Sequence, residues 1–199
     1  MTKSRREFYS LRQQEGYYKG AKKEKVRARS YFKLEQLDNK FNLIKENMKI
    51  IDLGAAPGGW LEYIDKKVKT SQIIGIDLLE IKNIHEFSDN VSVIEDDFNN
   101  LEEYELGEFD LVLSDMAPEF SGDNRADRGR THKINLDTIE FCTNNLKKGG
   151  NLAFKTFEGE DLHFVRNKAK ALFKEIREYK PKSSQKKSAE IFIVCLKKK

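Results

Sequence analysis

The chain has 199 residues, 38% of them hydrophobic and 35% charged, with a net charge of +4, which predicts one compact domain and excludes a fibrous or low-complexity protein. No apolar run is long enough for a membrane helix, no signal peptide is visible, and the two cysteines lack disulfide or zinc spacing. We therefore expect a cytoplasmic protein without membrane association and without a bound metal ion.

The chain begins with a predicted basic arm, residues 1–29. Residues 1–33 carry 11 Lys or Arg against 3 Asp or Glu, residues 163–199 carry 12 against 3, and residues 34–162 carry 14 against 27. Aromatic residues are interleaved with the N-terminal charges, namely Phe8, Tyr9, Tyr17, Tyr18 and Tyr31. Such a pattern suits contact with phosphates and stacking on bases, so nucleic-acid binding is predicted, with a solubilising tail as the alternative. Residues 30–199 are expected to form the single domain.

The rest of the chain alternates predicted helices and strands. Helical spacing is found in Ser30–Phe41 and in residues 135–146, with Gly149 and Gly150 as a stop, while residues 119–133 read as a polar loop. Strands are expected at residues 49–54, 72–77, 91–94, 109–114, 151–155, 176–180 and 191–196. This alternation predicts an α/β fold with a mostly parallel, doubly wound sheet.

A glycine-rich segment, residues 52–60, follows the first predicted strand and leads into a helix. Ligands of open α/β sheets bind at the carboxyl ends of the strands, where glycine lets the backbone approach closely. The spacing differs from the dinucleotide fingerprint, and Pro57 lacks an amide that a pyrophosphate would use. A ligand without phosphates, such as S-adenosylmethionine, therefore fits better than a nicotinamide cofactor, although a nicotinamide-dependent oxidoreductase remains a remote alternative.

Acidic residues follow the next strands and suit such a cationic ligand. Asp77 ends the second strand and is expected to accept hydrogen bonds from ribose hydroxyls. Asp97 is expected to accept from the adenine amino group, although the neighbouring Asp96 is an open alternative. Asp115 follows the fourth strand and is expected near the sulfonium and its methyl group.

Four further positions, Lys33, Asp115, Lys155 and Glu190, complete the pattern. Together with the 52–60 segment they match, in order and surroundings, the RrmJ/FtsJ family of ribose 2′-O-methyltransferases, and this chain resembles that family from about residue 8 to residue 196. The resemblance implies a Rossmann-like methyltransferase fold with a seven-stranded, mostly parallel sheet and helices on both faces. It also implies a Lys-Asp-Lys-Glu catalytic tetrad, and contacts to the cofactor from Gly58, Trp60, Asp77, Asp97 and Asp115.

One loop departs from the family pattern. The family has arginine after the serine of its Lys-Pro-x-x-Ser stretch, whereas this chain has Gln185 after Ser184. The departure bears on RNA contact by this loop and leaves the tetrad intact.

The tetrad also makes chemical sense. A ribose hydroxyl is a weak nucleophile, so methyl transfer needs its proton removed or strongly polarised as the bond forms. Lysine is a poor base at its ordinary pKa of about 10.4, but partial burial and a second ammonium favour the neutral amine. We expect Lys155 to accept the proton, Lys33 to supply the second charge, Glu190 to orient the ammonium groups and Asp115 to position Lys155.

The predicted function is therefore S-adenosylmethionine-dependent ribose 2′-O-methylation of RNA by a monomeric enzyme. A uridine of large-subunit (23S-type) ribosomal RNA is the expected target. Close relatives in the family modify the tRNA anticodon loop, which stays open as an alternative substrate.

Overall fold

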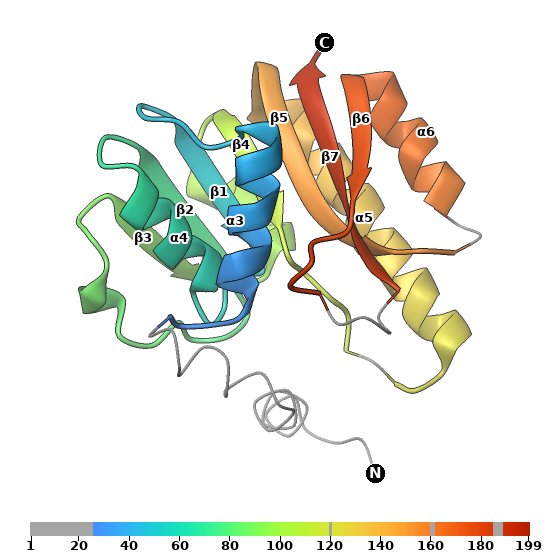
Figure 1. The fold of residues 1–199 in the computed structure, drawn as a ribbon, viewed down its shortest axis with the longest axis horizontal. Helices are drawn as coiled ribbons and strands as arrows, with labels where there is room; N and C mark the ends of the chain where they lie inside the picture. The colour runs from blue at the N-terminus through green and yellow to red at the C-terminus, as the bar shows by residue number, and fades with distance from the viewer. Residues whose placement is uncertain (1–25, 120, 160–161, 185–188) are drawn as a thin grey trace.

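The structure, a computed structural model, describes residues 26–119, 121–159, 162–184 and 189–199 and contains one seven-stranded sheet (Figure 1). The strand order is β3-β2-β1-β4-β5-β7-β6. In chain order the strands are β1 Lys49–Leu53, β2 Gln72–Asp77, β3 Val91–Glu95, β4 Phe109–Ser114, β5 Leu146–Phe157, β6 Phe173–Tyr179 and β7 Glu190–Lys198. β7 pairs antiparallel with both β5 and β6, and the other pairings are parallel. The predicted mostly parallel α/β fold is confirmed.

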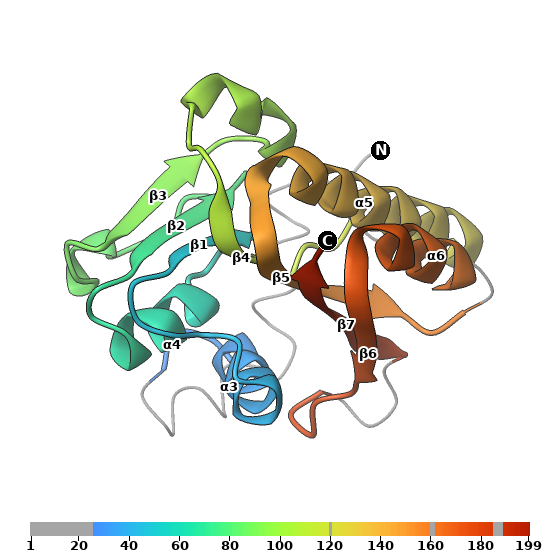
Figure 2. The ribbon, with the colours of Figure 1, turned by 90° about the horizontal axis from the view of Figure 1, so that it is seen from above.

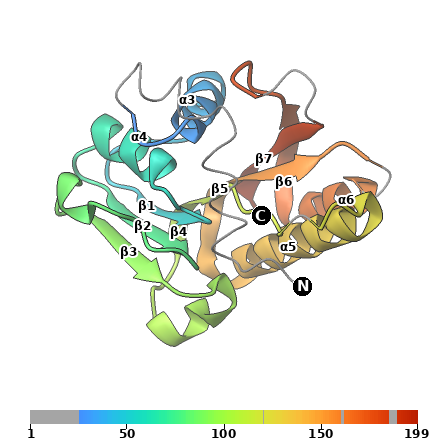
Figure 3. The ribbon, with the colours of Figure 1, turned by 90° about the horizontal axis from the view of Figure 1, so that it is seen from below.

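Helices cover both faces of the sheet. The α-helices are α3 Ser30–Phe41, α4 Gly59–Lys67, α5 Asn124–Asn145 and α6 Leu162–Leu172, and the short 3-10 helices are η1 Ile84–Glu86 and η2 Phe98–Tyr104. Figures 2 and 3 show α3 and α4 on one face and α5 and α6 on the other. The ends of the parallel strands therefore lie between the two helical layers.

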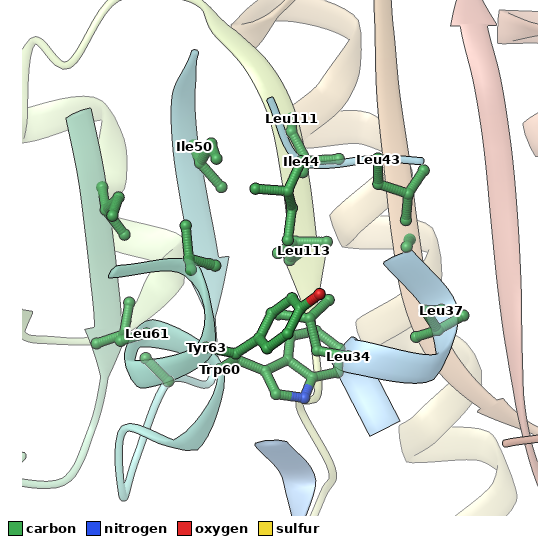
Figure 4. Packing of buried hydrophobic residues seen from close by; sticks show 14 of the residues in the cluster. Leu34, Leu37, Leu43, Ile44, Ile50, Trp60, Leu61, Tyr63, Leu111 and Leu113 are labelled. Atoms are coloured by element: carbon green, nitrogen blue, oxygen red, sulfur yellow. The ribbon is translucent and has the colours of Figure 1, made fainter. Parts of the chain in front are cut away.

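The side chains of the strands pack into two hydrophobic cores, one on each face of the sheet. On β5, Ala153 faces the α3/α4 core, whereas its neighbours Leu152 and Phe154 face the α5/α6 core. Near-continuous apolar runs are expected of strands buried on both sides. Figure 4 shows the first core, where Leu34 of α3 and Trp60 of α4 pack close to Leu113 of β4. Because Lys155 is two residues beyond Ala153, it lies on the same face as α3.

The prediction for residues 119–146 was partly wrong. The helix begins at Asn124, so most of the expected polar loop forms the first turns of α5. Gly149 and Gly150 lie within β5, where the pairing with β4 is irregular between Phe109 and Leu111. The buried side of α5 includes polar residues such as Thr131 and Asn135, which removes the apolar contrast that would have indicated the helix start.

Two sequence predictions, the basic arm and the absence of a membrane helix, can be compared only with the residues that the structure describes. Most of the basic arm, residues 1–25, lies outside the described residues. Within the described part of the chain, no helix is long and apolar enough to cross a membrane.

Candidate active site

The glycine-rich segment connects β1 to α4 at the carboxyl edge of the sheet. Gly54 has a φ of 80°, and a Cβ atom there would lie 2.7 Å from Cγ of Met116. The amide groups of Gly54 and Ala55 both donate to the main-chain oxygen of Ile76 on the neighbouring strand. Glycine is thus required at position 54 for two reasons: the backbone is left-handed there, and Met116 of the β4–α5 connection lies too close for a side chain.

Asp52 is a buried carboxylate at the end of β1. Its residue exposure is 1%, and neither of its carboxylate oxygens has a hydrogen-bond partner among the residues that the structure describes. Burial, together with the negative charges of Asp115 and Asp77, raises its pKa well above the ordinary carboxyl value. A buried carboxylate without a donor is costly, so it marks a place where a cationic or hydrogen-bond-donating ligand would be stabilised.

Asp77 lies at the end of β2 beside the same segment. Its two carboxylate oxygens accept from the amide groups of Ala56, at 2.9 Å, and Leu79, at 3.0 Å. These bonds fix the carboxylate against the glycine-rich segment. The predicted role as an acceptor for ribose hydroxyls is compatible with this position.

Asp96 and Asp97, the next two acids along the chain, differ in their hydrogen-bond partners. Asp96 uses one oxygen for Asp97 N and Asn100 Nδ2 and the other for the Tyr104 hydroxyl, and the last bond chiefly lowers its pKa. Asp97 caps η2 through Oδ1, which accepts from Asn99, and its Oδ2 has no hydrogen bond to any described residue. Asp97 is therefore the better placed of the two for an adenine contact.

Gly58 and Trp60, two further predicted cofactor residues, have different surroundings. Gly58 caps α4 with a φ of 100°, and a Cβ there would lie 3.2 Å from both Ile81 and Phe87. The Trp60 side chain is buried against Phe192, and its indole N–H donates to the main-chain oxygen of Ser30 at 2.8 Å. The Trp60 side chain thus belongs to the core, and a ligand contact there would involve its main chain.

Lys155 and Asp115 form a buried ion pair at the ends of β5 and β4. Nζ of Lys155 lies 2.8 Å from Oδ1 of Asp115 and also donates to the Asp115 main-chain oxygen. The Lys155 side chain is only 2% exposed, and that of Asp115 is 18% exposed. The sequence-based expectation that this lysine is buried is confirmed.

Lys33 and Glu190 form a second pair on the same face of the sheet. Nζ of Lys33 lies 2.8 Å from a carboxylate oxygen of Glu190, with both side chains nearly buried. Phe192 connects the two pairs: it is the β7 partner of Lys155, and its ring lies 5.8 Å from the Lys33 ammonium. Residues from α3, β4, β5 and β7 are therefore brought to one place, as the tetrad prediction requires.

Ser184 is a contributor that the sequence analysis did not assign. Its hydroxyl donates to Oε1 of Glu190 at 2.9 Å, and the residue is 7% exposed. The loop that carries it is held against α3, because Oε1 of Gln36 accepts from Lys182 N at 2.6 Å and Arg29 donates to Ser183 O. Only the folded arrangement reveals this contact, since Ser184 is one of several polar residues in its loop.

The basic residues at the junction of the arm and the domain are used internally. Arg27 donates to the main-chain oxygens of Lys82 and Asn83, pairs with Glu86, and covers the Phe87 ring at 4.2 Å. Its side chain is only 13% exposed. The Arg27 guanidinium therefore attaches the chain to the domain, and the RNA contact expected of the basic arm stays a prediction.

The site favours transfer chemistry on a ligand that carries positive charge. Within the described residues, no group of three or more His, Cys, Asp or Glu could hold a metal ion. Asp52, Asp77 and Asp115 instead gather at the ends of three adjacent strands, with a buried lysine beside them. An unpartnered buried acceptor and a close-approach glycine fit S-adenosylmethionine, which carries both a sulfonium and hydroxyl groups.

Comparisons with known proteins agree with this geometry. A family model described as FtsJ-like methyltransferase matches residues 26–198. "Ribosomal RNA large subunit methyltransferase E" of Methanosphaera stadtmanae is 38% identical over 191 residues, covering 91% of each chain. The protein of that name in Buchnera aphidicola is 37% identical over 190 residues, covering 92% of this chain and 90% of the relative.

A solved structure shares the fold at lower identity. The crystal structure of a Plasmodium falciparum protein described as a ribosomal RNA methyltransferase has a TM-score of 0.74 and 28% identity. It covers 87% of this chain, which in turn covers 98% of that protein. A fibrillarin/Nop5p complex, at 16% identity and a TM-score of 0.64, shows likeness of fold alone.

Proposed function

This chain belongs to the FtsJ-like methyltransferase family, and we propose that it methylates a ribose 2′-hydroxyl of large-subunit ribosomal RNA, a uridine being the expected target. The methyl donor is S-adenosylmethionine. The observation that carries the proposal is the presence of two lysine–carboxylate pairs, the buried Lys155 with Asp115 and the mostly buried Lys33 with Glu190, next to Phe192. A buried lysine at the end of a strand has no evident structural purpose, but it suits a reaction that must remove a proton.

The acidic strand ends would hold the methyl donor. S-adenosylmethionine, when bound, supplies an electrophilic methyl group on a positively charged sulfur. Asp77 would accept from the ribose hydroxyls and Asp97 from the adenine amino group, while Gly54 and Gly58 permit close backbone approach. The carboxyl group of Asp52 would face a positively charged part of the donor, and Asp115, which adds to the effect of burial in raising the pKa of Asp52, pairs with Lys155.

Lys155 would accept the proton of the ribose hydroxyl at its Nζ atom. The buried position excludes water, and Asp115 fixes the direction of the amine through two acceptors. Lys33, whose ammonium lies 5.8 Å from the ring of Phe192, the β7 partner of Lys155, would bring a second positive charge that favours the neutral form of Lys155. Glu190 holds Lys33 in place, and we assign Ser184 as a positioning residue that holds Glu190.

The basic arm, residues 1–29, would add affinity for the RNA, leaving residues 30–199 as the catalytic domain. In support, α3 begins at Ser30, and Arg27 and Arg29 fasten the chain to the domain where the arm leaves it. Contact with phosphates is then assigned to the charges before Arg27. We further propose that the enzyme acts as a monomer in the cytoplasm.

The deciding experiment compares substrates directly. Labelled methyl transfer is measured on intact large ribosomal subunits, naked large-subunit rRNA and tRNA in parallel, and the modified nucleotide is mapped. We expect incorporation into the large subunit or its rRNA at one ribose, and none with Lys155→Ala. Incorporation into the tRNA anticodon loop alone would overturn the ribosomal assignment, and NADH binding without affinity for S-adenosylmethionine would overturn the whole proposal.

A further inference from the structure

We propose that a surface formed by α5 and α6 is a second RNA-binding site, which stacks one unpaired nucleotide near the methylated one. This platform consists of Arg128 and His132 on α5 together with His163 and Phe164 on α6. The proposal rests on the proposed function, because it assigns a further part of the RNA substrate to the same enzyme. None of these four residues belongs to the tetrad or to the expected cofactor site.

The platform presents an exposed aromatic surface. Phe164 is 55% exposed and is one of four large apolar side chains exposed in the described part of the chain. Its ring lies 3.8 Å from that of His163, centre to centre, and 6.0 Å from that of His132 in an edge-on arrangement. A flat, exposed aromatic group held by neighbouring rings is the device on which proteins stack unpaired bases.

The polar groups beside the rings are also suited to a nucleotide. Arg128 is exposed and makes no hydrogen bond or ion pair with any residue that the structure describes. Its neighbours are already paired, Arg130 with Asp127 and Lys133 with Asp137. Arg128 is thus the cation of this surface that is available to a phosphate.

A small cavity next to the rings adds groups that could meet the edge of a base. It measures about 30 Å³ and is lined in part by Arg128, His132, Thr156 and Glu158. Nδ1 of His132 is buried without a hydrogen-bond partner in the described part of the chain. The cavity has room for about one water-sized group, so it would admit a polar substituent while the base itself lies on the Phe164 ring.

The platform's place in the fold explains why it would bind a neighbour of the target nucleotide. Thr156 lines the cavity and directly follows Lys155 on β5, but successive strand residues point to opposite faces of the sheet. Thr156 is held on the α5 face by Asn135 at 2.8 Å, whereas Lys155 lies on the α3 face. Figure 3, which looks onto the molecule from below, shows α5 and α6 across the sheet from α3 and α4. An RNA strand that crosses the sheet edge would therefore place one nucleotide at Lys155 and another on the platform.

The test measures binding of a short, fluorescently labelled single-stranded RNA and methyl transfer to large-subunit rRNA with the full-length protein. Phe164→Ala should weaken RNA binding about 5- to 50-fold, since stacking on one aromatic side chain contributes an effect of this size. Phe164→Trp should retain binding, and Phe164→Leu, which keeps apolar surface but loses the ring, should not. Single-turnover methyl transfer at saturating RNA should stay unchanged in all three variants, so the effect appears in KM and not in kcat.

Arg128→Gln tests the phosphate contact. It should reduce the dependence of log affinity on log salt by about 0.7, the share of one phosphate on a single strand. Lys168→Gln is the matched control, because Lys168 is a half-exposed α6 cation already paired with Glu140. Its salt dependence should equal that of the unaltered protein.

The outcomes separate the two proposals. Unchanged RNA affinity in both Phe164→Ala and Arg128→Gln would overturn the platform, as would equal losses in Phe164→Leu and Phe164→Trp if melting temperatures are unchanged. RNA binding that depends on Phe164 without methyl transfer to large-subunit rRNA would instead overturn the ribosomal assignment and retain the platform.

Discussion

Two fully buried aspartates, Asp38 and Asp52, show how differently the same residue type is treated in two regions of the molecule. Asp38, near the end of α3, is 1% exposed and accepts from Ile44 N at 2.9 Å and from the Tyr63 hydroxyl at 2.8 Å. It also pairs with Lys67. Asp52, also 1% exposed, has no donor for either oxygen in the described part of the chain.

The difference separates a stabilising group from a binding group. The Asp38 network joins α3, α4 and the chain before β1, and burial together with the Asp38 hydrogen bond raises the pKa of Tyr63. Asp52 lies at the carboxyl edge among other acids, where its charge opposes folding unless a ligand compensates. Variants in the Asp38 region should therefore change stability, and variants at the strand ends should change binding or rate.

The largest expected effect is on the chemical step at the strand ends. Lys155→Ala should lower single-turnover methyl transfer by about 10²- to 10⁴-fold, the usual contribution of a positioned base. Affinity for S-adenosylmethionine, measured by calorimetry, should be nearly unchanged. Lys147→Ala is the control, because Lys147 is on the same strand but pairs with Asp110 away from the site. Full activity in Lys155→Ala would remove the assignment of Lys155 as the base.

The two lysines are expected to act as a unit. Lys33→Ala should slow the chemical step, but the double variant with Lys155→Ala should be scarcely slower than Lys155→Ala alone. Strictly additive losses would keep a catalytic site and refute the coupling between Lys33 and Lys155.

The next largest effect is on stability at Asp38. Asp38→Ala should lower the free energy of unfolding by about 3 to 5 kcal/mol. The substitution removes the acceptor of the Tyr63 hydroxyl, the Ile44 amide and the Lys67 ammonium. Chemical denaturation measures the loss. Single-turnover methyl transfer below the unfolding transition should stay close to that of the unaltered protein. A large rate loss in the folded variant would break the distinction between the two regions.

A smaller effect is expected on cofactor affinity. Asp77→Ala should weaken binding of both S-adenosylmethionine and its demethylated product by about 1.5 to 3 kcal/mol, the value of a hydrogen bond to a charged group. Calorimetry with each ligand gives the change. Asp89→Ala, an exposed acid between β2 and β3, should leave both affinities unchanged.

The smallest effect is a pH dependence of stability at Asp52. Its folded-state pKa is raised, so above the unfolded carboxyl pKa of about 4 the folded protein holds a proton that the unfolded chain has lost. Stability therefore falls as pH rises from about 4 to the folded-state pKa. Asp52→Asn removes this titration, so its stability relative to that of the unaltered protein should rise over that pH range. If the stability difference between Asp52→Asn and the unaltered protein does not change with pH, the pKa of Asp52 is not raised in the folded protein.

The sequence predicted the strands better than the connections between them, and it named four residues, Lys33, Asp115, Lys155 and Glu190, that the fold places in two ion pairs. The helix Ser30–Phe41 and the strand Gln72–Asp77 have the expected bounds: Leu34, Leu37 and Phe41 follow helical spacing, and the strand is a short continuous apolar run. The start of α5 was missed because its buried face includes polar groups, and α6 was not anticipated. The roles of Asp52 and Ser184 could not be predicted, since whether a buried polar atom has a partner depends on residues distant in the chain.

The position of β7 has a consequence for synthesis of the protein. This strand is inserted between β5 and β6 and begins with Glu190, so a strand made after both of its neighbours occupies the interior of the sheet. As the chain leaves the ribosome, the half built from β1 to β4 can form early, but β5 keeps a bare edge until β7 emerges. A chain that stops before β7 would consequently expose that edge and lack Glu190.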